Sequence, residues 1–555
     1  MRNGNTVPKK LALRSKKLKL WCTCCILLAT LFGVWTNAEA LALRGLVIDA
    51  ARTPELLSYY YRVIDFSKDW GINVLVFRLT DDQGSALQFA SHPELITHLD
   101  AFTPAQLHDL AAYAQQQGVE IIPEIESFGH TNYIYGSASH AYLMDWDPSY
   151  PPPSGSPINR GLIPVDPDTL TLMADLYAEV ATIFPSNFLH GGCDEVGWGG
   201  ALESQAALQT RSRTQIFADY VNALNQLARS NGKDFIVWGD HVLRADPGIL
   251  ALMDTRIVIE DWNYWEADPA SFRSVANTAL AHGNRVIGSP ALIFSRWGPH
   301  AGASQLDNID AYADAYLSIS DPNALGVIVT NWYPTRYLVN SLWDGFAFAA
   351  VALNEGSAVA QSSARQRFVE RHYGATWNTD WYNAFQNYDQ LTPRRDVDCP
   401  AYQLPKPWFD DESLRQIIAC NDTSQSPFGG TLGLLDTVSG SVTQNGEDFA
   451  AFRLSVRYLD YMFWRNSSII NERQYGTLDT TTALINDIMN KDAQLLNELM
   501  ANWVEGRPTD SPLLTQLAID ADLQDQLVFR FSQAAAYSAL RAQDPAAFFA
   551  YLRSL

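Results

Sequence analysis

The stretch Phe188–Trp198, FLHGGCDEVGW, decides the fold and indicates the chemistry. An apolar run leads into two glycines and then into the adjacent acids Asp194 and Glu195. A short buried strand that ends in glycines and acids is how an α/β barrel or open sheet carries catalytic side chains to its rim. Two neighbouring carboxylates repel each other, so one keeps its proton to a higher pH. A glycosidase needs that asymmetry, although an isolated Asp-Glu pair is more often solvated surface or the start of a helix.

Short apolar runs alternate with amphipathic helical patterns eight times after residue 40. Strand–helix alternation implies a parallel sheet, and eight units predict a (β/α)₈ TIM barrel over residues 41–356. The expected strands are Leu46–Ala51, Asn73–Leu79, Val119–Ile125, Phe188–Gly192, Asp234–Trp238, Arg256–Asp261, Arg285–Ser289 and Gly326–Thr330. The expected helices include Pro54–Trp70, Pro104–Gln117, Asp168–Ile183, Thr214–Ser230, Pro269–His282 and Ile309–Ile319.

Polar and aromatic residues follow each expected strand at the same point of the unit. In a barrel these strand ends meet around one mouth, where barrel active sites lie. Any single residue among them could cap the next helix, but eight groups rich in acids and Trp favour a binding site. The groups are Asp49–Arg52, Thr80–Gly84, Glu124–His130, Asp194-Glu195, Trp238–His241, Asp261-Trp262, Ser289-Pro290 and Asn331-Trp332.

The character of the chain changes after about Gly356, where strand signals stop. Long amphipathic stretches predict a mainly α-helical C-terminal region over residues 357–555, with no catalytic pattern. Gln425–Gly446 is rich in Gly, Ser and Thr and is expected to be a loop. The expected helices are Arg365–Tyr373, Glu412–Cys420, Phe449–Arg465, Thr481–Glu505 and Pro512–Leu555.

Residues 1–40 are expected to be a signal peptide rather than part of the fold. Seven basic residues precede an apolar run from Leu20 to Trp35, and the segment ends in Ala38-Glu39-Ala40. A basic region, an apolar region and an A-x-A site are typical of export with cleavage. The alternative is an uncleaved membrane anchor, for which the apolar run is short. We therefore expect a periplasmic or secreted protein.

Composition limits the classes of partner. The net charge of −22 at pH 7 argues against nucleic acid and anionic membrane as partners. The 16 Trp and 24 Tyr residues either fill cores or offer faces to sugar rings. In an exported chain Cys399 and Cys420 are expected to form a disulfide, which leaves Cys193 as a buried odd thiol. Beyond residue 40, where Cys22, Cys24 and Cys25 are left behind, no C-x-x-C motif or His cluster suggests a metal site, so no metal and no cofactor are expected. The sequence does not indicate an oligomeric state.

Three motifs in order give the chain a family resemblance. HGGCDE (His190–Glu195), FRLTDDQG (Phe77–Gly84) and the stretch Phe102–His130 resemble the family 20 glycoside hydrolases, the exo-β-N-acetylhexosaminidases. The resemblance covers about Arg44 to Trp332. It implies hydrolysis of terminal β-linked GlcNAc or GalNAc from oligosaccharides or glycoconjugates, by a retaining mechanism in which the sugar's acetamido oxygen attacks its own anomeric carbon.

The resemblance also implies catalytic roles. Glu195 would be the general acid that protonates the leaving oxygen and later the base for water. Asp194 would orient and stabilise the acetamido group. His130, with Asp81 or Asp82, resembles the relay that tunes the acid, although a Gly-His loop histidine can equally be satisfied by backbone groups.

Substrate contacts follow from the same resemblance. Arg44 resembles the arginine that holds the sugar's hydroxyls. Asp82 is also expected to be a substrate-binding residue. Trp238, Trp262 and Trp332 resemble the aromatic walls of the sugar pocket, although each could be a core residue at the barrel rim.

The chain departs from the family pattern at several positions. Arg78 stands where a His is usual, and no Arg follows the DDQG motif. The stretch Ser289–Gly298 offers no equivalent of a Tyr and an Asp that contact the acetamido group, and Trp332-Tyr333-Pro334 replaces Trp-x-Glu. These departures resemble a divergent, hexosaminidase-D-like branch. Two other readings stay open: a catalytically weak glycan-binding barrel, and a retaining glycosidase with a protein nucleophile and a different substrate.

Overall fold

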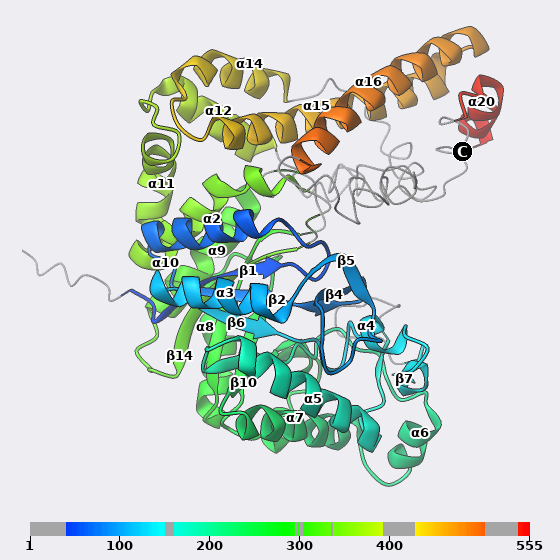
Figure 1. Cartoon of the computed structure of the whole chain (residues 1–555). Coiled ribbons are helices and arrows are strands. Elements are labelled where there is room, and N and C mark those ends of the chain that lie inside the picture. The colour runs from blue at the N-terminus through cyan, green and yellow to red at the C-terminus, as the bar shows by residue number, and fades with distance from the viewer. Residues whose placement is uncertain are drawn as a thin grey trace, which may run out of the picture. The chain divides into compact units, whose positions relative to one another are not determined.

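Eight parallel strands of the computed structural model close into a barrel (Figure 1). The structure describes residues 40–149, 160–294, 298, 303–332, 334, 337–391, 428–504 and 542–554. Pairing of the first strand with the last closes the sheet, so the predicted (β/α)₈ fold is confirmed. The strands in spatial order are β1 (Leu43–Asp49), β2 (Val74–Arg78), β6 (Glu120–Glu124), β9 (Phe188–His190), β10 (Asp234–Trp238), β11 (Val258–Trp262), β12 (Arg285–Ser289) and β14 (Ala324–Asn331).

Apolar residues on both faces of the strands explain why the barrel forms. One buried cluster that includes Val47, Val76, Ile122, Ile236 and Ile328 is separate from the larger core. Fully buried β-branched side chains are typical of the layers that fill a barrel interior. The larger core joins alternate strand residues to the surrounding helices.

The helices between the strands begin and end at residues that are typical helix caps. Thr103 and Gln106 form a capping box at the start of the third-unit helix, and Asp268 caps a helix whose first residue is a proline. Gly71 ends the first helix in the left-handed conformation, at φ +79°. The helices are α2 (Leu57–Trp70), α3 (Pro104–Gln116), α5 (Pro167–Ile183), α7 (Arg213–Ser230), α8 (Pro269–His282), α9 (Ala303–Leu317) and α10 (Trp343–Glu355).

The excursions that build the site leave the carboxyl ends of the strands. Figure 1 shows β4, β5, α4 and β7 gathered on one side of the barrel. They are the additions that follow β2 and β6 in the chain. These short elements are β3 (Thr80–Asp81), β4 (Gly84–Leu87), β5 (Thr97–Phe102), α4 (Asn132–Tyr135), η1 (Ala141–Leu143), β7 (Met144–Asp145), β8 (Gly161–Leu162), α6 (Leu202–Leu208), η2 (Asp240–Ala245), η3 (Leu250–Leu252), β13 (Ala291–Ile293) and η5 (Val339–Ser341).

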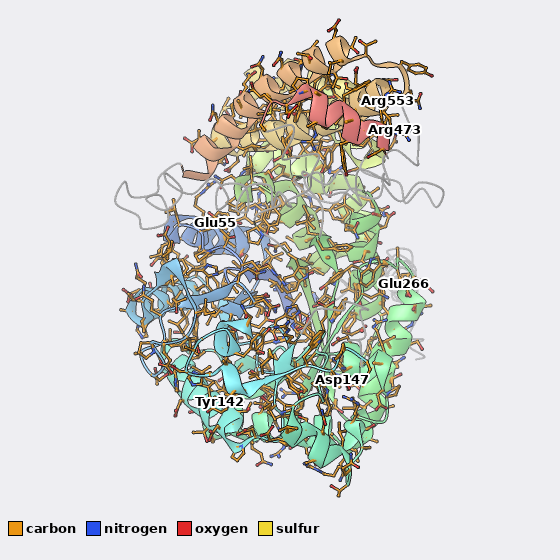
Figure 2. All side chains as sticks on the ribbon, turned by 90° about the vertical axis from the view of Figure 1, so that its right-hand side faces the viewer. Glu55, Tyr142, Asp147, Glu266, Arg473 and Arg553 are labelled. Atoms are coloured by element: carbon orange, nitrogen blue, oxygen red, sulfur yellow. The ribbon has the colours of Figure 1, made fainter. Side chains whose placement is uncertain are left out.

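The described C-terminal residues are helical, as the sequence predicts. At the end of α15, Arg473 Nε donates to the carbonyl of Leu552 at 3.2 Å, and Arg553 Nη2 donates to that of Gly476 at 2.7 Å (Figure 2). These bonds hold α20 against α15. The helices are α11 (Ser357–Arg371), α12 (Thr379–Leu391), α14 (Gly429–Val438), η7 (Ser439–Ser441), α15 (Gly446–Tyr475), α16 (Leu478–Val504) and α20 (Pro545–Ser554).

One expectation for this region is wrong. Gln425–Gly446 was expected to be a loop, but it contains α14, in which Thr431, Leu435 and Val438 are buried. Their spacing of four and three residues places them on one helix face, and burial of that face outweighs the poor helix propensity of the glycines.

Several predictions fall outside the described residues: the signal peptide, the Cys399–Cys420 disulfide, the helix Glu412–Cys420 and most of Pro512–Leu555. The domain boundary at residue 356 stays a prediction. Within the part of the chain that the structure describes, no helix is both long enough and apolar enough to span a membrane.

Candidate active site

The loop after β9 presents the two acids in an unusual backbone conformation. Cys193 and Glu195 have φ values of +74° and +48°, and Gly192 has +64°. A non-glycine residue in this region costs on the order of 1–3 kcal/mol, so the surroundings must hold it there. A Cβ at Gly192 would lie 2.0 Å from Glu126 Oε2. Only glycine therefore lets the loop turn so close to the acid beneath it.

Three buried side chains hold this loop through its backbone amides. Asp240 Oδ2 accepts the Glu195 N–H at 3.0 Å, and His241 Nε2 accepts the Val196 N–H at 3.3 Å. Glu126 Oε2 accepts the Cys193 N–H at 3.2 Å. Burial raises the pKa of Asp240 to about 7 and lowers that of His241 to about 4. A neutral His241 is what the contact requires, because only an unprotonated nitrogen can accept a hydrogen bond.

The thiol of Cys193 is free and buried, as the sequence predicts. Burial, together with the charges of Glu126 and Asp194, raises the pKa of this thiol well above its usual value. A thiolate is therefore strongly disfavoured, and Cys193 acts as a small packed residue rather than as a nucleophile.

His130 lies between two carboxylates. Its Nε2 is 3.2 Å from Glu195 Oε2, and its Nδ1 is 3.2 Å from Asp82 Oδ2. Burial alone would lower the pKa of His130, but the charges of Asp81 and Asp194 and these hydrogen bonds raise it well above 6.5. The ring is therefore an imidazolium at neutral pH that donates to both neighbouring carboxylates.

Asp194 is a second acid with a different environment. Burial raises the pKa of Asp194 to about 6, although the charges of His130 and Arg78 oppose the rise. Its Oδ2 lies 3.9 Å from His130 Nε2. Its Oδ1 is buried and has no hydrogen-bond partner among the described residues. A buried carboxylate oxygen without a partner is costly, and a ligand's N–H would satisfy it.

A fully buried arginine, Arg78, forms ion pairs with acidic side chains beneath the pocket. Arg78 Nη2 lies 2.6 Å from Asp81 Oδ2, and its Nη1 lies 2.6 Å from Glu126 Oε1 and contacts Glu124. Burial alone would lower the pKa of Arg78, but the charges of Glu124, Glu126 and Asp81 raise it. Burial likewise opposes ionisation of Asp81, but Arg52 and Arg78 hold its pKa well below the usual value. This arginine takes the position where the family resemblance predicts a histidine.

Aromatic side chains wall the pocket above these charges. The cavity has a volume of about 160 Å³. The Trp238 and Trp332 rings lie edge to face at 5.9 Å, and Trp332 Nε1 donates to the Tyr264 hydroxyl at 2.8 Å. Trp265 is half exposed at the rim. The lining residues are Arg52, Arg78, His130, Asp194, Glu195, Trp238, Trp262, Tyr264, Trp265, Phe294 and Trp332.

The structure brings most of the predicted site residues together. Asp81 and Asp82 lie behind His130, within 3.8 Å and 3.2 Å of its Nδ1. The predicted residues that line the pocket itself are His130, Asp194, Glu195, Trp238, Trp262 and Trp332. Their individual roles in binding and catalysis stay predictions.

The placement of Arg44 is a correction. Its Nε donates to the backbone carbonyl of Gly71 at 2.8 Å, and it lies near the start of β1, whereas the pocket lies at the carboxyl ends of the strands. A residue that precedes a barrel strand faces the opposite end from the site. Arg52, which follows the same strand, occupies the pocket instead, with its guanidinium carbon 5.3 Å from the centre of the Trp332 ring.

The site residues that were not predicted from the sequence include Arg52, Asp240 and Tyr264. Arg52 and Asp240 stand in the polar groups that follow β1 and β10, so the strand-end pattern could have found them. Tyr264 follows β11 by two residues, beyond the Trp that the family resemblance highlighted. Nothing in the sequence alone indicates that its hydroxyl meets Trp332.

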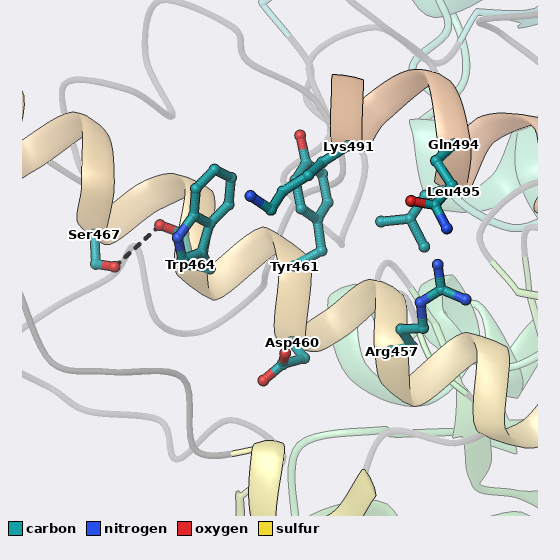
Figure 3. Close-up of a pocket in the computed structure, with 8 residues that line it drawn as sticks. All are labelled: Arg457, Asp460, Tyr461, Trp464, Ser467, Lys491, Gln494 and Leu495. Atoms are coloured by element: carbon teal, nitrogen blue, oxygen red, sulfur yellow. Dashed lines mark hydrogen bonds between the residues drawn. The ribbon is translucent and has the colours of Figure 1, made fainter. Parts of the chain in front are cut away.

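A second hollow, of about 510 Å³, lies between α15 and α16 (Figure 3). Lys491 Nζ lies 4.1 Å from the centre of the Trp464 ring, and the same helices contribute Arg457, Tyr461 and Asp460. The lining residues include one acid, Asp460, and no pair of facing acids. This hollow lacks the arrangement that general acid–base chemistry requires.

The acidic groups around His130 could in principle approach a cation. Asp81, Asp82 and His130 form one such set, and His130, Asp194 and Glu195 form another. Both sets rely on a ring that is protonated at neutral pH, and an imidazolium has no lone pair to give to a metal.

Comparisons with known proteins agree with this geometry. Residues 42–307 match the model of the glycosyl hydrolase family 20 catalytic domain. A curated β-hexosaminidase subunit beta from Felis catus is 25% identical over 309 residues, covering 47% of this chain and 56% of that protein. A β-N-acetylhexosaminidase from Cellulomonas fimi is 28% identical over 264 residues, covering 45% and 47%.

A solved family 20 exo-β-N-acetylglucosaminidase from Vibrio harveyi superposes with a TM-score of 0.45 at 20% identity, covering 57% of this chain and 55% of that chain. The chain thus spans about half the length of the curated relatives it matches. The family match runs from β1 to the start of α9, and β14 and the C-terminal helices lie beyond residue 307.

Proposed function

Residues 42–307 form a catalytic domain of glycosyl hydrolase family 20, and from this premise we propose that the protein is an exo-acting β-N-acetylhexosaminidase. Its substrates are oligosaccharides or glycoconjugates that end in a β-linked N-acetylhexosamine. The observation that carries the proposal is the chain Asp82–His130–Glu195, with 3.2 Å at each step, beside an Asp194 oxygen that lacks a partner.

Glu195 supplies the acid for bond cleavage in this proposal. Its carboxyl and the ring of His130 share one hydrogen bond, so the pair holds a proton that either group can carry. When the glycosidic bond lengthens, the leaving oxygen becomes basic and takes the proton from Glu195. The resulting carboxylate then removes a proton from the water that completes hydrolysis. Asp82 keeps the His130 ring oriented during both steps, and the ring becomes neutral when the shared proton passes to Glu195.

Asp194 serves the sugar's 2-acetamido group. The acetamido oxygen attacks the anomeric carbon, and positive charge spreads over the resulting five-membered ring. Asp194 Oδ1, buried and unpartnered within the described structure, accepts the acetamido N–H and stabilises that charge. Asp194 and Glu195 are the only carboxylates among the described residues that line the pocket. This favours nucleophilic attack by the substrate over attack by a third protein carboxylate.

The size and walls of the pocket support exo action on one sugar ring. The volume of about 160 Å³ is below the roughly 300–1,000 Å³ of sites for drug-sized ligands. Trp238, Trp262 and Trp332 offer apolar faces to the ring and the acetamido methyl group. Arg52, which is paired with Asp49 and Asp81, also lines the pocket, and in this proposal it contacts the sugar's hydroxyls in the place that Arg44 was predicted to fill.

The test compares initial rates of the purified chain on aryl β-GlcNAc, β-GalNAc and β-glucoside. The proposal predicts turnover of the 2-acetamido sugars and none of the 2-hydroxy sugar, because only the former carries the nucleophile. Cleavage of the glucoside with accumulation of a covalent glycosyl-enzyme would instead establish a protein nucleophile. Tight binding of the 2-acetamido sugars without turnover between pH 4 and 8 would establish a glycan-binding barrel.

A variant of Asp194 tests substrate assistance separately. Asp194→Asn keeps the shape of the side chain but removes the charge that stabilises the intermediate. Azide should not restore the rate of this variant, because the missing step is attack by the acetamido group. Full rescue through a β-linked azide product would assign Asp194 a different role.

We also propose that the protein is exported, from the basic and apolar pattern of residues 1–40. N-terminal sequencing of the protein recovered from its native host should begin at Leu41. Recovery of residues 1–40 on a membrane-bound chain would support the anchor instead.

A further inference from the structure

Two histidines and a glutamate meet outside the pocket, on the excursions that follow β2 and β6. His92 and Glu94 lie between β4 and β5, and His140 lies between α4 and η1. Glu94 Oε1 is 2.9 Å from His92 Nδ1 and 3.7 Å from His140 Nε2. One ligand atom from each residue lies within 4.8 Å of the other two. The three side chains are between 13% and 34% exposed, so an ion can reach them.

The remaining ring nitrogens are held by further polar groups. His92 Nε2 lies 3.2 Å from Asp175 Oδ2, and His140 Nδ1 lies 3.3 Å from the hydroxyl of Ser137. Metal-binding histidines commonly use the second nitrogen in this way, because the outer hydrogen bond fixes the ring and its tautomer. Both nitrogens that face Glu94 are thereby directed toward a common point.

We propose that His92, Glu94 and His140 form a zinc site in which water completes the coordination. Zinc–nitrogen and zinc–oxygen bonds of about 2.0–2.2 Å in a tetrahedron place ligand atoms about 3.3–3.5 Å apart. The observed separations of 2.9 and 3.7 Å lie on either side of that value. Two imidazoles with one carboxylate suit zinc or a related transition metal, whereas magnesium and calcium prefer oxygen ligands throughout.

The protonation of the cluster also suits a metal ion. His92 has a carboxylate against each ring nitrogen, Glu94 at Nδ1 and Asp175 at Nε2. An imidazole with one proton can donate to only one of them. A metal ion on Nδ1 satisfies Glu94 and leaves the Nε2 proton for Asp175.

The site would join two loops that also carry the catalytic relay. Ile96, two residues after Glu94 along the chain, donates its N–H to the carbonyl of Tyr133 at 2.9 Å. Asn132 in turn donates its side-chain amide to the carbonyl of Asp82 at 2.8 Å. None of the three proposed ligands lines the pocket. The ion would therefore stabilise the loops that position Asp82 and His130 without touching the substrate.

The experiment measures zinc on the tag-free full chain after treatment with a chelator and dialysis. Titration calorimetry and elemental analysis should find one equivalent of zinc in the wild-type protein. His140→Ala and Glu94→Gln should each lose it, whereas His108→Ala, which removes a histidine 61% exposed beside Asp109, should retain it. No zinc on the wild type, or binding by His140→Ala and Glu94→Gln equal to that of the wild type, would overturn the proposal.

A second variant distinguishes a preorganised metal site from nonspecific binding of zinc to exposed histidines. Asp175→Asn leaves the three ligands in place but weakens the acceptor behind His92, and loss of such a partner lowers metal affinity about 10–100-fold. Zinc should also raise the melting temperature of the wild type and not that of His140→Ala. Affinity unchanged in Asp175→Asn together with no shift in melting temperature would contradict a site of this construction. Both readouts are independent of glycosidase activity.

Discussion

Two hollows among the described residues differ in size and in chemistry, and the smaller one holds the predicted catalytic residues. The cavity between α15 and α16 is about three times larger, at about 510 Å³ against about 160 Å³. Its charges are paired along exposed helix surfaces: Arg457 with Glu498 at 2.6 Å, and Lys491 with Asp487 at 2.5 Å. Exposed pairs of this kind are screened by solvent and contribute little.

The barrel pocket confines its charges instead. Asp194, Glu195 and His130 lie close together above the buried Arg78, in surroundings of low polarisability. Electrostatic interactions are stronger there, and pKa values move far from their usual range. The pKa of Asp194 is raised by burial, whereas that of Glu498 is lowered by its hydrogen bond to Arg457. Burial and charge, rather than volume, therefore distinguish a reactive site from a surface hollow.

The largest expected effect is on the rate after removal of the acid. Glu195→Gln should lower kcat/KM on substrates with poor leaving groups by about 10²–10⁴-fold, because general acid help contributes that much. On good leaving groups the loss should be smaller. The matched control, Glu498→Gln at the α15–α16 hollow, should leave both rates unchanged. Equal losses for the two leaving groups would remove Glu195 from the role of acid.

The next largest effect is a difference in the free energy of unfolding between variants of two arginines. Arg78→Met leaves buried carboxylates without their cation, and breaking a buried ion pair costs about 3–5 kcal/mol. Arg457→Met breaks a pair of which Glu498 is 38% exposed, so we expect a loss of about 1 kcal/mol or less. Urea unfolding of both variants measures the difference. Similar losses would show that burial does not separate the two regions as described.

The loop contact of Asp240 gives a smaller effect. Asp240→Ala removes the acceptor of the Glu195 N–H, and loss of about 1 kcal/mol of hydrogen bonding should lower kcat about fivefold. Asp240→Asn retains an acceptor oxygen and should recover most of the rate, with KM similar in both variants. A change in KM alone, or no recovery in Asp240→Asn, would contradict a positioning role.

The pH dependence follows from the raised pKa of Asp194, about 6. The carboxylate form is needed to stabilise the acetamido-derived intermediate, so kcat/KM should fall as the pH drops below about 6. Initial rates measured between pH 4 and 8 locate this acidic fall in kcat/KM. A limb near pH 4, the ordinary range of an exposed Asp, would mean that Asp194 is not desolvated as the structure indicates.

The smallest effect concerns the α15–α16 hollow itself. Lys491→Met removes the ammonium group above the Trp464 ring, an exposed cation–π contact worth about 0.5–1 kcal/mol. Turnover should not change, and the melting temperature should shift only slightly. A loss of activity in this variant would connect the helical hollow to catalysis and would contradict the distinction between the two regions.

The sequence predicts the barrel well because each strand is a short run of buried β-branched residues. All eight expected strands form, and Asp234–Trp238 and Arg285–Ser289 have the predicted bounds. The prediction of a loop over Gln425–Gly446 was wrong. Its glycines suggested a loop, but burial of Leu435 and Val438 stabilises α14.

The site was partly predictable for a similar reason. Strand ends converge in any barrel, so residues that follow the strands were brought together, including Asp194 and Glu195. The prediction for Arg44 was wrong because the family's substrate-binding arginine was assigned to the start of β1. The active site lies at the carboxyl ends of the strands, which favours Arg52. The meeting of His92 with His140 could not be read from the sequence, because it depends on how two loops fold against each other.

The most direct test of the central claim is the affinity of a thiazoline analogue of the cyclic acetamido intermediate, measured by calorimetry on wild type and Asp194→Asn. We predict tight binding to the wild type, at least about 100-fold tighter than the parent sugar, as transition-state analogues show. Asp194→Asn should lose most of that gain, and Lys491→Met should keep it. Binding no tighter than that of the sugar, or equal binding by Asp194→Asn, would contradict substrate-assisted catalysis in the barrel pocket.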